Sequence, residues 1–226
     1  FQAYFQPIVD TKTKEVYKYE ALIRYITKEG VEIAPYHFIN VAKKTKLYPN
    51  IIKIVIQDSF KLIKNKNKRV SVNISFDDIA NEETTAFIYD ILEKNKEYTK
   101  FLEFEILESE EISDFNEVSK FIAEIKKFDC IVGVDDFGAG YSNFNLLTLL
   151  DIDFVKIDGS LIEKINTSKD LEIIVNTIAN FSKEFKVKTV AEYVSNEDIY
   201  NKIKELNIDY CQGYYFDRPL SYDNIK

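Results

Sequence analysis

Polar side chains interrupt the apolar runs of this 226-residue chain near the place where each run ends. In a barrel of parallel strands the carboxyl ends converge on one mouth, which is where such proteins build their sites. Carboxylate and amide oxygens without histidine or cysteine suit hard cations such as Mg²⁺ or Mn²⁺ better than zinc. The candidates are Glu20, Asn73, Glu105, Asp135, Asp136, Lys156, Asp158, Glu192 and Gln212.

Four of these residues, Glu20, Asn73, Glu105 and Asp135, would supply oxygen ligands to a common point if the strands converge as expected. Taken singly, an acid at a strand end is more often a helix cap or a solvated loop residue. The hypothesis of a cation site therefore depends on the whole set rather than on any one member.

The stretch VGVDDFGAGYSNF, residues 132–144, places two carboxylates side by side after an apolar run. Neighbours in a straight strand point to opposite faces, so Asp135 and Asp136 reach one site only if the chain turns there. Gly138 and Gly140 permit such a turn. Two carboxylates, one of them shared, are what a centre with two ions about 3.5–4 Å apart would need. The alternative is a surface loop that merely turns.

Two other pairs have a spacing that puts both members on one face of a strand. Glu103 and Glu105 would form an acidic face, which is costly inside a packed barrel unless a cation offsets it. Lys156 and Asp158 also share a face, and a lysine in an apolar strand implies a partner or an anion. An ordinary buried ion pair is the alternative for Lys156.

Aromatic residues flank two of these motifs. Tyr141 and Phe144 follow the acid pair, and Tyr214 and Tyr215 follow Gln212. Most tyrosines and phenylalanines must belong to the core, but these four have positions from which they could stack on a nucleobase.

Short apolar runs alternate with amphipathic stretches along the whole chain, which predicts repeated βα units. The first two strands are joined by a short polar stretch and should pair antiparallel. The number of units, and the absence of GxGxxG after the first strand, favour a closed barrel over an open doubly wound sheet. Strands are predicted at 4–10, 16–25, 69–75, 101–107, 130–135, 154–158, 187–192 and 209–216. Helices are predicted at 35–46, 49–65, 77–94, 115–128, 143–150, 169–185 and 196–206.

The composition excludes several classes of protein. A formal net charge of −8 argues against a partner that is a nucleic acid polymer. Cys130 and Cys211 are too few for a disulfide framework, and no run is long enough to cross a bilayer, so we expect a cytoplasmic domain. Residues 1–226 are expected to form one domain, and the absence of methionine suggests a segment of a longer multidomain protein, for which a membrane anchor elsewhere in the chain stays open.

The motifs resemble, in order and spacing, those of the EAL domain family, the cyclic di-GMP phosphodiesterase module of bacterial signalling proteins. The matching stretches are YFQPIVD, YEALIR, VSVNIS, EFEILES, VDDFGAGYSNF, VKIDGSLI, TVAEYVS and CQGYYFDRPL. The resemblance implies a modified TIM-type (β/α)8 barrel whose first strand is antiparallel to the rest. It also implies metal-dependent hydrolysis of cyclic di-GMP to linear 5'-pGpG with Mg²⁺ or Mn²⁺, two ions per site.

The resemblance also implies roles for individual residues. It assigns Glu20, Asn73, Glu105, Asp135 and Asp136 to the metals. Lys156 matches the lysine that holds or deprotonates the attacking water, with Glu192, Asp158 and Gln212 around it and Glu108 steadying the loop after Asp136. Arg24, Gln6 and Leu22 match substrate-binding positions. A homodimer, with YSNFNLLTLL contributing apolar residues, and a covalently linked sensory or GGDEF-type domain are implied partners.

Two residues depart from the family pattern AEGVE. Tyr193 replaces the glycine and Ser195 replaces the acid. Ser195 can serve as the N-cap of the following helix, with Asp198 at the third helical position. Two alternative functions remain: a catalytically weak or inactive domain that acts as a cyclic di-GMP receptor, and a scaffold for partner proteins that would not need an intact cation site.

Overall fold

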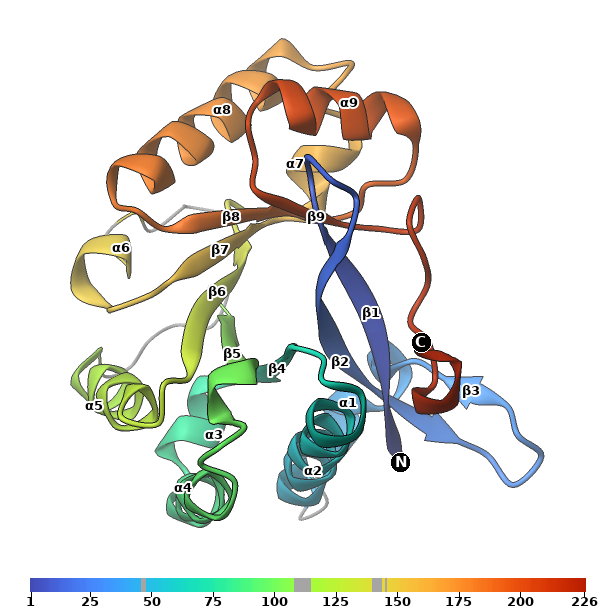
Figure 1. Ribbon diagram of the computed structural model, residues 1–226, viewed down its shortest axis with the longest axis vertical. Helices are drawn as coiled ribbons and strands as arrows, with labels where there is room; N and C mark the ends of the chain where they lie inside the picture. The colour runs from blue at the N-terminus through green and yellow to red at the C-terminus, as the bar shows by residue number, and fades with distance from the viewer. Residues whose placement is uncertain (46–47, 108–114, 140–143, 145) are drawn as a thin grey trace.

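Eight strands close into a barrel in the computed structural model, which describes residues 1–45, 48–107, 115–139, 144 and 146–226 (Figure 1). β1 pairs with both β2 and β9, which closes the ring, and the short β3 extends from β2 outside it. The strands are β1 (Gln2–Asp10), β2 (Val16–Ile26), β3 (Glu32–Ile33), β4 (Val70–Ile74), β5 (Leu102–Leu107), β6 (Ile131–Phe137), β7 (Phe154–Ile157), β8 (Lys188–Ala191) and β9 (Tyr210–Gln212).

The direction of β1 is opposite to that of the other strands in the ring. β1 is antiparallel to β2 and to β9, whereas each later pair, from β2 and β4 round to β8 and β9, is parallel. The predicted modified (β/α)8 barrel is therefore confirmed. A consequence is that the carboxyl ends of seven strands meet at one mouth.

Helices surround the barrel and bury their apolar faces against the outside of the strands (Figure 1). The predicted strand alternation leaves one face of each strand for these helices and the other for the interior of the barrel. The longer helices are α2 (Tyr48–Lys66), α4 (Glu82–Lys94), α5 (Phe115–Lys126), α8 (Lys169–Glu184) and α9 (Glu197–Glu205). The shorter ones are α1 (Ile39–Lys43), α3 (Phe76–Ala80), α6 (Leu146–Leu149) and α7 (Gly159–Glu163), with 3-10 turns at Pro35–His37, Thr99–Phe101 and Tyr222–Asn224. No described helix has the length and apolar character needed to cross a bilayer.

Local capping explains where the predicted helices were wrong. The helix predicted over 77–94 is two helices, because Asn81 adopts an extended conformation and caps α4 through its side chain. Ser75 and Asp78 form a reciprocal capping box on α3. The helix predicted over 35–46 is a 3-10 turn followed by the short α1.

The N-cap predicted for Ser195 is also wrong. Asn196 caps α9, because its Oδ1 accepts a hydrogen bond of 3.0 Å from the Ile199 backbone N–H. An asparagine satisfies that donor as well as a serine would, and it lies one residue closer to the helix. Ser195 is left exposed, which frees its side chain for the cavity described below.

The barrel interior is apolar at one end only. Ile8, Phe154 and Val190 form a small buried cluster inside the ring, with Ile131 and Tyr210 packed against it. We call this cluster the floor of the barrel, and we call the opposite end, at the carboxyl ends of the parallel strands, the mouth. The floor closes the interior, so side chains that point inward above it are shielded from water.

Candidate metal centre

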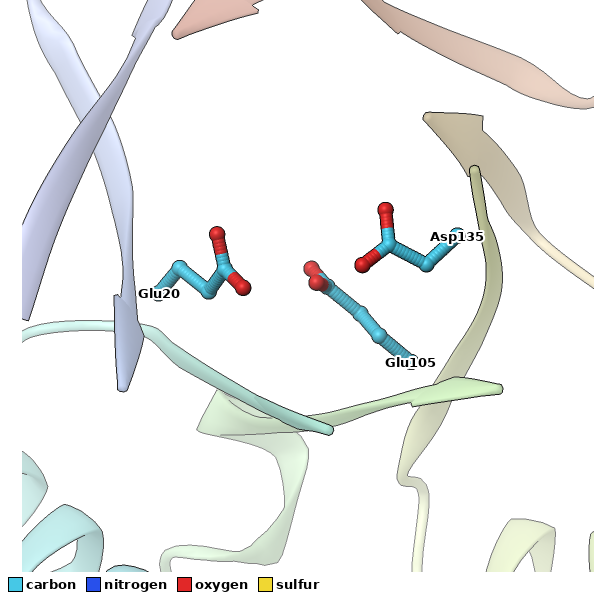
Figure 2. A group of neighbouring side chains, drawn as sticks. All are labelled: Glu20, Glu105 and Asp135. Carbon is cyan, nitrogen blue, oxygen red and sulfur yellow. The ribbon is translucent and has the colours of Figure 1, made fainter. Parts of the chain in front are cut away.

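The strand register brings the predicted acids to the same level of the mouth. Asn73 of β4 lies opposite Glu105 of β5, and Asp135 of β6 lies opposite Leu107, one pleat further along. Glu20 reaches the same space from β2, where it pairs with Ser71 of β4. Figure 2 shows the carboxylates of Glu20, Glu105 and Asp135 pointing toward one another from three strands. Convergence of these three acids follows from a period of two along each strand.

Lys156 lies in the middle of this group of acids. Its Nζ lies 3.2 Å from Glu20, 3.0 Å from Glu105, 2.9 Å from Asp135 and 2.9 Å from Glu192. The lysine is fully buried, so its charge would be very costly without these partners. The partner predicted for Lys156 is thus a set of four carboxylates, so an ordinary ion pair with one acid does not describe this site.

The excess of acids at the mouth shifts the pKa of several groups. Burial lowers the pKa of Lys156, but the surrounding carboxylates, led by Asp135, raise it well above its usual range. Burial raises the pKa of Asp135 well above its usual range, and the neighbouring acids add to this effect against the opposing influence of Lys156. Burial and the same kind of repulsion raise the pKa of Glu192 to about 7. The mouth therefore holds more negative charge than Lys156 alone can offset.

Asp136 joins the group because the backbone turns at this residue. Asp136 has φ of 56°, a left-handed conformation that aspartate tolerates better than most residues, and the register of β6 shifts between Val134 and Phe137. Carboxylate oxygens of Asp135, Asp136 and Glu192 consequently lie within 4.8 Å of one another. The predicted turn is confirmed, but it begins at Asp136 itself, two residues before Gly138, which also has a positive φ.

Two overlapping groups of acids thus have the geometry of cation sites. Oxygens of Glu20, Glu105 and Asp135 also lie within 4.8 Å of one another, so Asp135 belongs to both groups. Asn73 donates from Nδ2 to Glu20 Oε1 at 2.7 Å, while its buried Oδ1 has no hydrogen-bond partner in the described part of the chain. A buried acceptor without a donor among anionic oxygens is what a hard cation would satisfy. The residues present therefore fit a divalent cation.

Asp158 and Gln212 lie at the edge of the centre. Gln212 is buried and donates from Nε2 to Glu20 Oε2 at 2.8 Å, which holds that carboxylate in place. Asp158 caps α7, because its carboxylate accepts a hydrogen bond of 2.9 Å from the Ser160 backbone N–H. Its negative charge also affects the pKa of Asp136. Burial, and then the charge of Asp158, raise the pKa of Asp136. Asp158 thus lies beside Asp136 at the start of α7.

A cavity of about 360 Å³ opens beside the centre and shares Glu20, Glu192 and Gln212 with it. Val194 accepts and donates backbone hydrogen bonds across this region, and Gly213 permits the close approach because a Cβ there would lie 2.0 Å from the Val194 carbonyl oxygen. The other lining residues are Gln6, Leu22, Tyr193, Ser195, Gly213 and Tyr214.

Two aromatic side chains of this cavity are accessible. Tyr193 is 71% exposed and Tyr214 is 63% exposed, so part of each ring is accessible to a ligand, although Arg218 lies 4.8 Å from the centroid of the Tyr214 ring. Phe144 instead packs edge to face against Phe137 and Phe181, and Tyr215 packs against Tyr200 and Phe216, so these two rings contact the protein rather than the cavity.

Of the remaining predicted site residues, two line the cavity, one lies beside it and two fall outside the described residues. Arg24 lies on the same face of β2 as Glu20, with its guanidinium 5.9 Å from the Tyr4 ring centroid, and it does not line the cavity. Glu108 and Tyr141 fall outside the residues that the structure describes. Gln6 and Leu22 line the cavity, and Gln6 Nε2 donates to the Asp217 carbonyl at 3.3 Å.

One residue of the site was missed from the sequence. Lys18 is buried and donates from Nζ to Glu103 at 2.7 Å and to Glu105 at 3.2 Å. It is the cation that the acidic face of β5 required. Its position two residues before Glu20, on the same face of β2, was a signal available in the sequence.

Fold and site together define a class: a (β/α)8 barrel with one reversed strand and an acidic centre at its mouth that suits divalent cations. A profile of the EAL domain matches residues 1–219. The chain therefore belongs to the EAL domain family. It is 32% identical to an EAL domain protein of Listeria monocytogenes EGD-e, whose crystal structure matches with a TM-score of 0.91 over 100% of this chain and 90% of that one.

Two curated relatives carry names that state an activity. The chain is 31% identical to "Cyclic di-GMP phosphodiesterase PdeA" of Borreliella burgdorferi, over 97% of this chain and 33% of that protein. It is 30% identical to "Cyclic di-GMP phosphodiesterase PdeF" of Escherichia coli, over 95% of this chain and 29% of that protein. The chain thus spans about a third of the length of these relatives.

Proposed function

We propose that this chain hydrolyses one phosphodiester bond of cyclic di-GMP and yields linear 5'-pGpG in a reaction that depends on divalent cations. The observation that carries the proposal is the convergence of Glu20, Glu105, Asp135 and Glu192 around Lys156, with an unpaired Asn73 oxygen beside them. The printed activities of the two curated relatives support the choice of substrate.

The two overlapping groups of acids support two ions, Mg²⁺ or Mn²⁺, with Asp135 shared between them. In this proposal Glu20, Asn73 and Glu105 complete one site, and Asp136 with Glu192 completes the other. When bound, such ions lower the pKa of a water molecule and offset charge on a phosphoryl oxygen. The residues of the chain fix the positions of these oxygens on rigid strands, so little reorganisation is needed on binding.

Lys156 acts in the proposed reaction as a fixed positive charge beside the attacked phosphate. Its raised pKa in the surrounding acids keeps it protonated near neutral pH, which favours a clamp on developing negative charge over a general base. Gln212 holds Glu20, and Asp158 holds the start of α7 next to Asp136. Glu108 is proposed to steady the loop after Asp136.

The cavity beside the centre is the proposed substrate site. Gln6 and Leu22 line it, and the exposed rings of Tyr193 and Tyr214 suit a purine base. Arg24 lies further along the same strand face as Glu20 and is proposed to meet a substrate phosphate. The volume of about 360 Å³ suits part of the dinucleotide, and the remainder would lie across the open mouth.

The context of the chain is also part of the proposal. We propose that residues 1–226 are one domain of a longer cytoplasmic or membrane-anchored signalling protein, because they span about a third of the curated relatives. A sensory or GGDEF-type domain would be linked to it, and two copies would associate as a homodimer. Light scattering tests the dimer: a fully active monomer at working concentration would exclude it.

The test of the activity compares wild type with Glu20→Gln in the presence of Mg²⁺ or Mn²⁺. We expect wild type to convert cyclic di-GMP to pGpG, and the variant to lose at least about 100-fold in turnover, because a ligand oxygen is lost. Glu15→Gln, a change of an exposed acid on the β1–β2 turn, is the matched control and should keep full activity.

The outcomes distinguish the alternatives. Binding of cyclic di-GMP without turnover under either cation would indicate a receptor. Calorimetry that detects neither Mn²⁺ nor ligand binding would indicate a scaffold.

A further inference from the structure

Lys18 and Glu103 form a second charged layer between the floor of the barrel and the metal centre. Lys18 exposes 1% of its side chain and Glu103 exposes 2%. Lys18 Nζ donates to Glu103 Oε2 at 2.7 Å and to Glu105 Oε1 at 3.2 Å. The other oxygen of Glu103 lies 3.4 Å from Arg69, whose side chain is partly exposed to water, so Glu103 remains the buried partner of Lys18. The second contact of Lys18, which reaches a member of the acid centre, calls for an explanation.

The floor fixes the position of the Lys18 ammonium group. Its Nζ lies 3.5 Å from the centroid of the Phe154 ring, within the range of a cation–π interaction. The Phe154 ring in turn lies directly over Gly133, where a Cβ would come within 2.3 Å of the ring. The glycine is therefore required for the ring to reach this place. Lys18 is held between a packed ring and two carboxylates, which leaves it little freedom to move.

Glu105 is divided between the two buried lysines. Its Oε1 accepts a hydrogen bond from Lys18, while its Oε2 lies 3.0 Å from Lys156 in an ion pair. That ion pair is not aligned as a hydrogen bond, and Oε2 has no hydrogen-bond partner among the described residues. Oε1 of Glu105 is thus held by Lys18 on the floor side, and Oε2 faces the acids of the mouth.

We propose that Lys18 is a positioning residue of the metal centre, which holds one oxygen of Glu105 so that the other is presented to a divalent cation. The inference rests on the proposed function, because it assumes that Glu105 binds a cation. It differs from a role in stability alone: Glu103 neutralises Lys18, whereas the bond to Glu105 orients a ligand. Groups that orient a metal ligand in this way commonly change metal affinity or activity by 10–100-fold when removed.

The experiment removes both charges of the Lys18–Glu103 pair at once. Lys18→Met with Glu103→Gln leaves the net charge of the chain unchanged and replaces the buried pair by groups of similar size, a kind of change that is often neutral for stability. We expect the double variant to remain folded and its Mn²⁺ dissociation constant, measured by calorimetry, to rise about tenfold. Electron paramagnetic resonance of bound Mn²⁺ should report a changed ligand geometry.

A matched control is provided by an ion pair on the outside of the barrel. Lys53 and Glu83 lie 2.6 Å apart on α2 and α4, and Lys53→Met with Glu83→Gln removes the same two charges far from Glu105. The control should bind Mn²⁺ as wild type does. A Lys18/Glu103 variant that also binds Mn²⁺ within twofold of wild type would overturn the inference.

A second measurement does not depend on the folding of the variant. Crystals of the wild-type protein loaded with Mn²⁺ should keep the contact between Lys18 Nζ and one oxygen of Glu105, with the cation on the other oxygen. A Glu105 that has turned away from Lys18, or that binds the cation through both oxygens, would overturn the inference. Failure of the wild type to bind Mn²⁺ at all would instead overturn the proposed function.

Discussion

The mouth and the floor end of this barrel both bury a lysine among glutamates, but the balance of charge differs. Near the floor, Lys18 lies over an aromatic ring and contacts Glu103 and one oxygen of Glu105, and Arg69 also contacts Glu103. At the mouth, Lys156 meets four carboxylates and Asp136 lies beside them. The lower layer is therefore close to neutral, whereas the upper layer is left with several uncompensated negative charges.

The difference indicates what each layer is for. A buried layer whose charges cancel contributes to a fixed arrangement of side chains. A layer with excess negative charge is unfavourable by itself and becomes favourable when cations bind, as expected where function is selected at the expense of stability. The pKa shifts reflect the number of lysines that each acid contacts. Burial and repulsion raise the pKa of Glu192, which contacts Lys156 alone among the described lysines, to about 7, whereas Lys156 and Lys18 together overcome burial and lower the pKa of Glu105 to about 2.

The largest expected effect is on turnover at the mouth. Lys156→Met should reduce turnover of cyclic di-GMP by about 100-fold or more, because it removes the charge beside the attacked phosphate. Mn²⁺ should still bind, since the acids remain. Steady-state kinetics at saturating Mn²⁺ is the measurement, with Lys183→Met on the exposed side of α8 as the control. Unchanged turnover would show that Lys156 has no role in the reaction and is a buried lysine that only balances the charge of its neighbours, as Lys18 balances that of Glu103.

The free energy of unfolding of the metal-free protein should depend on pH because of the excess of acidic groups at the mouth. An acid whose pKa is higher in the folded than in the unfolded chain favours folding below its unfolded pKa, and this contribution is lost as the pH rises through the folded value. For Glu192 the interval runs from the ordinary value of 4.5 to about 7. We expect the free energy of unfolding in EDTA to fall by about 3 kcal/mol between these limits.

Urea unfolding at pH 5 and pH 7.5 measures this change. Glu192→Gln should flatten the profile, and divalent cations should reverse it at pH 7.5. A stability that rises over this interval would contradict the assignment of excess charge to the mouth. Glu105 contributes in the opposite sense, but its pKa of about 2 places that contribution below pH 4.5.

Two amide substitutions should act in opposite directions on the metal-free protein. Glu103→Gln near the floor removes the carboxylate that Lys18 and Arg69 share and should destabilise by about 2 kcal/mol. Asp135→Asn at the mouth relieves repulsion, while Lys156 keeps three other partners, and it should stabilise by about 1 kcal/mol. Urea unfolding in EDTA measures both. The same sign for the two changes would mean that the layers do not differ.

The smallest effect concerns the cavity beside the mouth. Tyr193 has φ of 56°, a conformation that favours glycine, and its ring lies against Gly159. Tyr193→Gly should relieve strain and change the free energy of unfolding by only about 0.5 kcal/mol, because the gain is offset by the flexibility of glycine. The Michaelis constant for cyclic di-GMP should rise several-fold if the ring contacts substrate. An unchanged constant would exclude that contact.

The alternation of apolar and polar residues was sufficient to predict the barrel and the convergence of Glu20, Glu105 and Asp135. The period of two along each strand determines which side chains point into the barrel, and closure of the barrel then brings those at the carboxyl ends together at the mouth. The sequence could not show that Lys18 serves the acidic face of β5, because that contact joins residues 85 positions apart. The register between β2, β4 and β5 creates it.

Local details were harder to predict than the site. Asn81 divides one helix in two, and Asn196 rather than Ser195 caps α9, because several neighbouring residues had comparable capping ability. The turn at Asp136 was expected from the glycines that follow, yet the aspartate itself adopts the left-handed conformation. Backbone conformation at such points is decided by packing around the chain rather than by the local sequence.

The lysine at the centre of the mouth has a consequence for biogenesis. Small zinc domains stay unfolded when their ion is withheld, since nothing else neutralises their ligands. Here an ammonium group carried by the chain already stands among the acids, so the newly made domain can reach its native shape before any ion is supplied. Folding and loading become separate events, and ions that bind afterwards add to the stability of a domain that is already folded.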